Sequence, residues 1–164
     1  MSPQMSDEIS PQIKMDSAFD NYFSLSAILK ADIRSLLDEE RRDQYWRRNF
    51  IRSSGALFEG YAHCLREMCP APGKSERRFS APDRIELALN RAYSFFELAP
   101  APNFDCKEWQ SAKNVFTKRN GLMHPKNPSD LEVTDELWRE SHEGVAWLME
   151  QFFIDSLLQQ KYLS

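Results

Sequence analysis

The stretch Lys118–Pro125 (KRNGLMHP) contains two side chains that could do acid–base chemistry at a phosphate. Arg119 and His124 are separated by four residues, and Asn120 directly follows the arginine. A neutral imidazole can act as general base or acid near neutral pH, and a guanidinium can stabilise a charged phosphorane. RNA carries its own nucleophile, the 2′-hydroxyl, so this pair is the minimum for cleaving RNA without a metal. DNA lacks that hydroxyl and should be inert.

The position of Arg119 on its helix is unusual, because a helical wheel places it between Ala112 and Met123, inside the apolar stripe. Three outcomes are open for a guanidinium there: a salt bridge to a carboxylate of the first or fifth helix, a route to solvent along its stem, or a bound anion. Pro125 predicts that the helix ends at His124, which frees the imidazole to converge with Arg119. The alternative for His124 is a surface histidine that caps the helix.

The charge around this stretch favours an anionic partner. From Asp105 to Lys126 five basic residues stand against two acidic ones, in a chain with a net charge of −4. We expect three of these lysines to contact RNA, namely Lys113, Lys118 and Lys126, although a solvated face is the alternative. The overall negative charge argues against nonspecific coating of nucleic acid, which depends on phosphate neutralisation. The acidic segment 130–143 could be a solvated face, bind a basic partner or pair with Arg119.

Four other features have a structural interpretation. Glu59 and His63 are four apart on one helix, which favours a surface ion pair over a metal site. Ser54 should donate back to the carbonyl of Phe50, and His142 should be structural. A flank of small side chains would let another helix approach closely, within the bundle or across a dimer; it consists of Ser53, Ala56, Gly60 and Cys64.

The elements that must position these residues are all helices. Apolar residues recur at intervals of three and four, and no segment shows a sustained period of two. We expect helices at residues 17–40, 43–68, from Ser80 to Pro100, at 107–124, and one long last helix from Thr134. The predicted fold is an all-α, up-down bundle of about five helices, with a flexible arm at residues 1–15 and one helical domain at 16–164.

Composition bounds the class of protein. A chain of 164 residues with 41% hydrophobic residues can form one globular core. No apolar run is long enough to span a membrane, and the opening MSPQMSDEIS has no signal-peptide pattern, so we expect a cytoplasmic protein without a membrane partner. The three cysteines show no zinc or disulfide spacing, so we expect reduced thiols, no metal and no cofactor.

The motif Arg119-Asn120-Gly121-Leu122-Met123-His124 resembles that of the HEPN family (higher eukaryotes and prokaryotes nucleotide-binding). That motif is an arginine, four to six residues and a histidine, usually with a polar residue directly after the arginine. The predicted helix over Phe50–Met68 is similar to the HEPN helix that packs against the motif. The resemblance covers about residues 17–160, and only the motif itself is specific.

The resemblance implies a homodimer in which the motifs of two subunits form one cleft that cleaves RNA without a metal. Arg119 would bind the scissile phosphate, His124 would move the proton, and Asn120 would position either of them. Many such enzymes are toxins or phage-defence effectors, which implies an antitoxin or regulatory protein as a further partner. A tyrosine that one subgroup uses for control is replaced here by Lys126. The alternatives are a catalytically silent HEPN-like binding module and a helical scaffold unrelated to the family.

Overall fold

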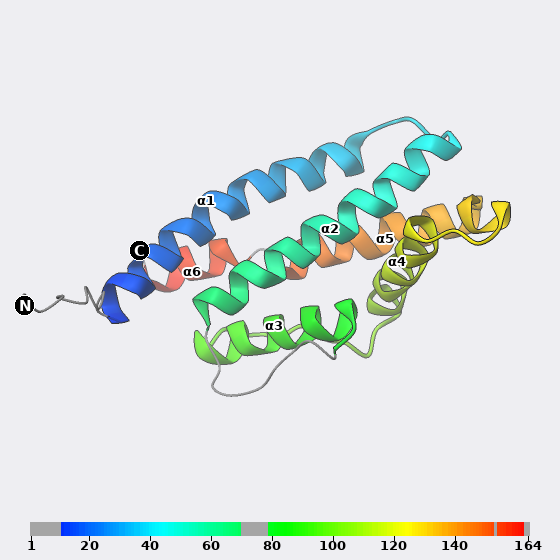
Figure 1. The fold of residues 1–164 in the computed structure, drawn as a ribbon. Coiled ribbons are helices and arrows are strands. Elements are labelled where there is room, and N and C mark those ends of the chain that lie inside the picture. Colours follow the sequence, from blue (N-terminus) through cyan, green and yellow to red (C-terminus); the bar gives the residue numbers. More distant parts are fainter. Residues whose placement is uncertain (1–10, 70–78, 153, 163–164) are drawn as a thin grey trace, which may run out of the picture.

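The computed structural model describes residues 11–69, 79–152 and 154–162, and in these ranges the chain contains helices and no strand (Figure 1). The prediction of an all-α bundle of about five helices is confirmed. The elements are α1 (Pro11–Asp38), α2 (Gln44–Met68), α3 (Ala81–Phe95), α4 (Lys107–Met123), the short 3-10 helix η2 (Pro128–Leu131), α5 (Asp135–Phe152) and α6 (Asp155–Tyr162). None of the described helices has the length and apolar content of a membrane span.

Side-chain caps determine where the helices begin. The Asp43 carboxylate accepts a hydrogen bond from the backbone of Trp46 and starts α2. Ser80 forms a capping box with Asp83 at the start of α3, and Thr134 Oγ1 accepts from Leu137 N at 3.2 Å at the start of α5. Each cap satisfies a backbone donor that the first helical turn leaves unpaired. The predicted starts at Ser80 and Thr134 are therefore confirmed.

Several boundaries differ from the sequence-based expectation; α3, for example, ends at Phe95 and does not continue to Pro100. Helix α1 begins at Pro11, within the segment 1–15 that was expected to be a loose arm; residues 1–10 lie outside the described part of the chain. The expected single last helix is instead two, because α5 ends at Phe152 and α6 starts at Asp155. Between them Ile154 is fully buried, and the Asp155 carboxylate receives Lys30 Nζ of α1 at 2.6 Å. A tertiary ion pair therefore lies at the start of α6.

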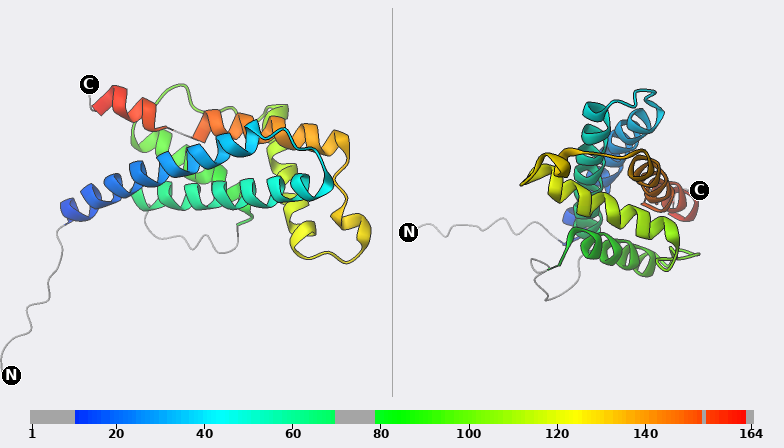
Figure 2. Two further views of the ribbon diagram at one scale, coloured as in Figure 1. Left: turned by 90° about the horizontal axis from the view of Figure 1, so that it is seen from above. Right: turned by 90° about the vertical axis from the view of Figure 1, so that its right-hand side faces the viewer.

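Helix α2 is the centre of the bundle. It runs beside α1 and also packs against α3 and α4, while α5 lies against α4 (Figures 1 and 2). Large side chains of α2 are almost completely excluded from solvent, including Phe50, Phe58, Tyr61 and Leu65. Burial of such side chains contributes roughly 1.5–3 kcal/mol each to folding. This packing fixes α2 as the surface on which the end of α4 rests.

The contact between α4 and α5 is unusually close. A Cβ atom placed on Gly144 of α5 would lie 2.5 Å from the backbone nitrogen of Ala112 in α4. Near this crossing Trp109 packs against Trp147 and Phe104, with ring centroids 5.9 Å and 5.1 Å away. Only glycine permits that backbone approach, so the position of α4 depends on Gly144.

Candidate functional site

The stretch that ends α4 has the predicted shape. The helix stops at Met123, and His124 follows as its C-cap with φ −131° and ψ 60°, outside the helical region. The His124 amide still donates to the carbonyl of Asn120 at 3.1 Å. Pro125 disfavours helical geometry at the residue before it, which accounts for the end at this point. The prediction that the helix ends at the His-Pro step is confirmed.

Arg119 pairs with a carboxylate on a helix that the sequence did not suggest. Its Nη1 donates to Glu59 Oε2 of α2 at 2.9 Å, and the arginine side chain is 21% exposed. Of the three outcomes that the sequence left open, the structure shows the salt bridge, but the suggested carboxylates of α1, α5 or segment 130–143 are not its partner. The reason is that Arg119 faces α2. An ion pair with this degree of exposure contributes about 0–1 kcal/mol to stability.

Glu59 serves two arginines at once. Arg84 of α3 places its Nη2 3.7 Å from Glu59 Oε1, so each carboxylate oxygen faces a different guanidinium. The expected surface pair between Glu59 and His63 is wrong, because His63 Nδ1 instead lies 3.3 Å from Arg66 Nη2 on the same helix. Glu59 therefore joins α2, α3 and α4 at one point.

A glycine makes room for the Arg119 stem. A Cβ atom on Gly55 of α2 would lie 2.5 Å from Cδ of Arg119 and 3.3 Å from its Nε. That Nε is buried and has no hydrogen-bond partner within the described residues. The apolar part of Arg119 thus lies flat against the backbone of α2, while its terminal nitrogens reach Glu59 and solvent.

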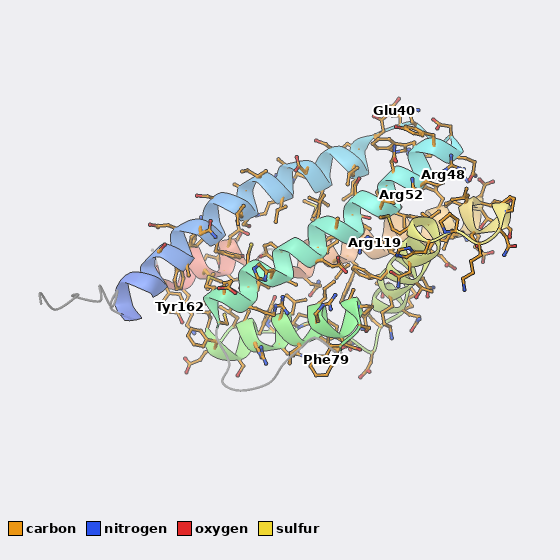
Figure 3. The ribbon with its side chains drawn as sticks, in the orientation of Figure 1. Glu40, Arg48, Arg52, Phe79, Arg119 and Tyr162 are labelled. Atoms are coloured by element: carbon orange, nitrogen blue, oxygen red, sulfur yellow. The ribbon has the colours of Figure 1, made fainter. Side chains whose placement is uncertain are left out.

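Two further arginines of α2 lie beside the end of α4. Arg52 Nη2 donates to the carbonyl of Leu122 at 3.0 Å, and Arg48 Nη1 contacts the carbonyl of Leu131 at 3.3 Å. The labelled side chains of Arg48, Arg52 and Arg119 lie along the side where α2 and α4 meet (Figure 3). A cation near the last carbonyls of a helix is favourable. Arg52 thus connects α2 to the end of α4, and Arg48 connects α2 to η2.

We call the residues Arg48, Arg52, Gly55 and Glu59 the α2 site face. They recur at intervals of four, three and four, so they share one side of the helix. The sequence did not indicate a functional role for this face, because a stripe of charged residues with one glycine is typical of the solvent side of a helix. The periodic spacing around Gly55 was the signal that could have revealed it.

The other predicted site residues belong to α4 and to the segment that follows it. His124 and Asn120 are exposed, and within the described chain the His124 ring makes no hydrogen bond to Arg119 or to any other group. Lys118 Nζ donates to the carbonyl of Asp130 at 2.8 Å, which ties α4 to the following loop. Lys126 is exposed and Lys113 is half-buried. One subunit therefore brings Arg119 and Glu59 together and leaves the imidazole open to another molecule.

The loop after His124 is held by one carboxylate. Asp130 Oδ2 accepts from the backbone of Lys126 at 2.7 Å and of Asn127 at 2.9 Å. These two bonds, the first being the stronger influence, lower the pKa of Asp130 below its usual value. The fixed loop in turn fixes the backbone on the C-terminal side of the imidazole.

The residues expected to be structural behave as predicted. Ser54 Oγ donates to the carbonyl of Phe50 at 2.7 Å inside α2. The ring of His142 stacks on Phe50, and its Nε2 lies 3.0 Å from the carbonyl of Leu37. In the flank of small residues, Ala56 and Gly60 are exposed. Since no heavy atom lies within 4 Å of a Cβ placed on Gly60, none of the described helices covers that point.

The cysteines are free thiols. Burial raises the pKa of the Cys69 thiol to about 12 and also raises that of Cys64. Cys106 has a different role, because its Sγ accepts from Trp109 N and caps α4. No cluster of three or more potential metal ligands occurs in the part of the chain that the structure describes.

Comparison with known proteins gives no relative. No protein family matches this chain, and neither the curated proteins nor the solved structures give a significant match. The interpretation of the site therefore depends on its own geometry.

Proposed function

We propose that this protein is a metal-independent endoribonuclease of the HEPN type, acting as a toxin or phage-defence effector. The observation that supports this most is the end of α4, where a partly exposed guanidinium and an exposed imidazole belong to the same helix end. Both groups needed for metal-free RNA cleavage are then accessible to an external strand. The cationic surroundings, including Arg48, Arg52 and Lys126, favour a polyanion.

The reaction would use the substrate's own hydroxyl. His124 would remove the proton from the 2′-oxygen, which attacks the neighbouring phosphorus, and a second imidazole would protonate the departing 5′-oxygen. The products are a 2′,3′-cyclic phosphate and a free 5′-hydroxyl. Arg119 would stabilise the additional charge on the phosphorane, and Asn120 would position the phosphate or the imidazole.

The second imidazole would come from a second copy of the chain. In this proposal His124 has no partner within its own subunit because its partner groups belong to the other one. The exposed Ala56 and Gly60 on α2 leave space for a close helix contact near the site. A homodimer would thus bring two copies of Arg119 and His124 into one cleft.

The Arg119–Glu59 ion pair favours a second candidate, a HEPN-like module that binds nucleic acid or a partner protein without cleaving. A guanidinium that is already neutralised by a carboxylate stabilises a phosphorane less well than a free one. In this candidate the ion pair holds α4 against α2, and His124 is an exposed residue that caps the end of α4. The two candidates differ in whether RNA is cut.

A cleavage assay in EDTA distinguishes them. We expect wild-type protein to cut single-stranded RNA into products with 2′,3′-cyclic phosphate ends and to leave DNA intact. His124→Ala should lower the rate by about a hundred- to ten-thousand-fold, as expected for loss of a general acid–base group. His63→Ala is the matched control, since His63 is an exposed histidine on α2, and should retain activity.

Three results would contradict the nuclease proposal: a requirement for a divalent metal, cleavage that survives both His124→Ala and Arg119→Ala, or a strictly monomeric protein that is fully active. RNA binding without cleavage would support the binding module instead. In cells, growth arrest on expression of the wild type but not of His124→Ala would agree with a toxin.

A further inference from the structure

Two arginines from different helices face the same carboxylate on α2, that of Glu59. Arg119 of α4 and Arg84 of α3 lie on opposite oxygens of the Glu59 carboxylate, at 2.9 Å and 3.7 Å. The arrangement has two positive charges and one negative charge. A planar anion with two oxygens is thus already held between two guanidinium groups, and it belongs to the protein itself.

The two arginines are positioned by contacts other than Glu59. Arg84 Nη1 donates to the carbonyl of Phe79 at 3.1 Å, and the stem of Arg119 lies against Gly55. Removal of the carboxylate would therefore leave both guanidinium groups near their present places.

All three side chains of this cluster reach solvent. The exposed fractions are 21% for Arg119, 33% for Arg84 and 29% for Glu59. Ion pairs with such exposure are weak, so an incoming anion can compete with Glu59 for the two arginines. A glutamate on a helix can also turn outward by rotation about its side-chain bonds alone.

We propose that Arg84 and Arg119 form a binding site for one phosphate of an RNA strand, and that Glu59 is its internal occupant, displaced when the phosphate enters. A phosphodiester has one negative charge and two non-bridging oxygens, so it matches the carboxylate in charge and in the number of acceptors. Arginine recognises both groups through the same parallel donors. The identity of the ligand as RNA rests on the proposed nuclease function; the two-arginine geometry does not.

The test measures binding of an RNA that cannot be cut. A fluorescent 2′-O-methyl oligonucleotide lacks the free 2′-hydroxyl, so its dissociation constant can be measured for every variant by anisotropy. Glu59→Gln removes the competing charge and should tighten binding by roughly two- to fivefold. Glu67→Gln, an exposed glutamate further along α2, is the matched control and should change binding little.

A second variant tests the role of Arg84. Adding Arg84→Gln to Glu59→Gln should remove the gain and lower the slope of log Kd against log salt by about one, the effect of one lost phosphate contact. Circular dichroism and thermal melting of each variant check that the fold is retained.

Several outcomes overturn this site. Equal tightening by Glu59→Gln and Glu67→Gln would mean that loss of any negative charge on α2 strengthens RNA binding. Weaker binding by Glu59→Gln would mean that Glu59 only positions Arg119. Absence of binding by both the wild type and Glu59→Gln would also refute it. If the binding pattern holds while native RNA remains uncut, the nuclease proposal fails and the phosphate site stands. If native RNA is cut but the binding pattern is absent, the phosphate site fails and the nuclease proposal stands.

Discussion

Arg119 of α4 lies directly across Gly55 of α2, so close that a single added methyl group would stand 2.5 Å from its Cδ atom. The apolar part of the Arg119 side chain packs against the backbone of α2 at this point. The ion pair to Glu59, one turn further along α2, depends on this packing. The direction of the guanidinium is therefore set by a residue that has no side chain.

The first prediction concerns that glycine. Gly55→Ala should push the Arg119 stem away from α2 and break its bond to Glu59. Alanine is favoured over glycine in a helix by about 0.5–1 kcal/mol, while displacing a flexible side chain from an exposed ion pair costs about 0–1 kcal/mol. We therefore expect little net change in the free energy of unfolding but a large loss of RNA cleavage. Urea denaturation and the EDTA cleavage assay measure the two effects.

Gly60→Ala is the matched control on the same helix. No atom lies within 4 Å of a Cβ placed there, so alanine should stabilise the helix by about 0.5–1 kcal/mol. If the two substitutions had equal effects on stability, the close contact between Gly55 and Arg119 would not exist in solution.

The second prediction concerns the crossing of α4 and α5. Gly144→Ala places a methyl group 2.5 Å from the backbone nitrogen of Ala112 and 2.8 Å from its Cα. Because backbone cannot move aside as a side chain can, we expect destabilisation of about 3 kcal/mol or more. Gly121→Ala, in open space on α4, should be tolerated. A stable Gly144→Ala protein with an unchanged melting temperature would show that the helices are further apart.

The third prediction concerns alkaline pH. The hydroxyls of Tyr22 and Tyr61 are hydrogen-bonded to each other in the core, and burial raises the pKa of both groups. In the unfolded chain tyrosines ionise near pH 10, while the folded chain keeps these protons. The free energy of unfolding is therefore unaffected by ionisation of these two hydroxyls below about pH 10. Above that pH it falls by up to about 1.4 kcal/mol per pH unit for each hydroxyl, because the unfolded chain ionises and the folded chain does not.

Replacing Tyr22 by phenylalanine should make the free energy of unfolding fall less steeply as the pH rises. Urea unfolding of Tyr22→Phe between about pH 8 and 11 should show a shallower decline in stability with pH than the wild type. Tyr45→Phe, at a tyrosine that is 60% exposed, should leave the slope unchanged. Identical slopes for Tyr22→Phe and the wild type would mean that the Tyr22 hydroxyl is not shielded from water.

The fourth prediction concerns the loop after the site. Backbone donors lower the pKa of Asp130, so its stabilising effect is present above the usual aspartate range and is lost as the pH falls through and below it. Asp130→Ala should speed amide hydrogen exchange at Lys126 and Asn127 and weaken RNA cleavage. Glu132→Ala, in the same exposed segment, should leave exchange at those amides unaltered. Slow exchange in Asp130→Ala would refute this role.

Local features of the fold were predictable, and pairings between distant residues were not. Ser80 and Thr134 cap their helices through bonds to residues three positions away, and Pro125 acts on its immediate neighbour. Such signals are visible in a short window of sequence. The break between α5 and α6 has no comparable local signal, and the residue paired with Asp155 beside it is Lys30 of α1, which is distant in sequence.

The same limit applies to the site. The sequence singled out Arg119 as an ion on a packing face, and that is where it lies. Its partner Glu59 is 60 positions away, and the local spacing that marks a face of α2 does not say which distant residue lies across from it. Arg84 was not predicted for the same reason. The nuclease activity, the RNA contacts of the lysines and the dimer remain predictions.

The close crossing at Gly144 has a consequence for precision at the site. Arg119 is seven residues beyond Ala112 on α4, so it lies about 10 Å from the crossing, and His124 lies about 18 Å away. A rotation of α4 about the crossing by roughly 6° would therefore move the arginine by about 1 Å and the imidazole by almost twice that. Errors of this size slow enzymes by about a hundredfold. Under the proposed nuclease function, mutations in the hydrophobic interior should thus change the rate of RNA cleavage at the surface.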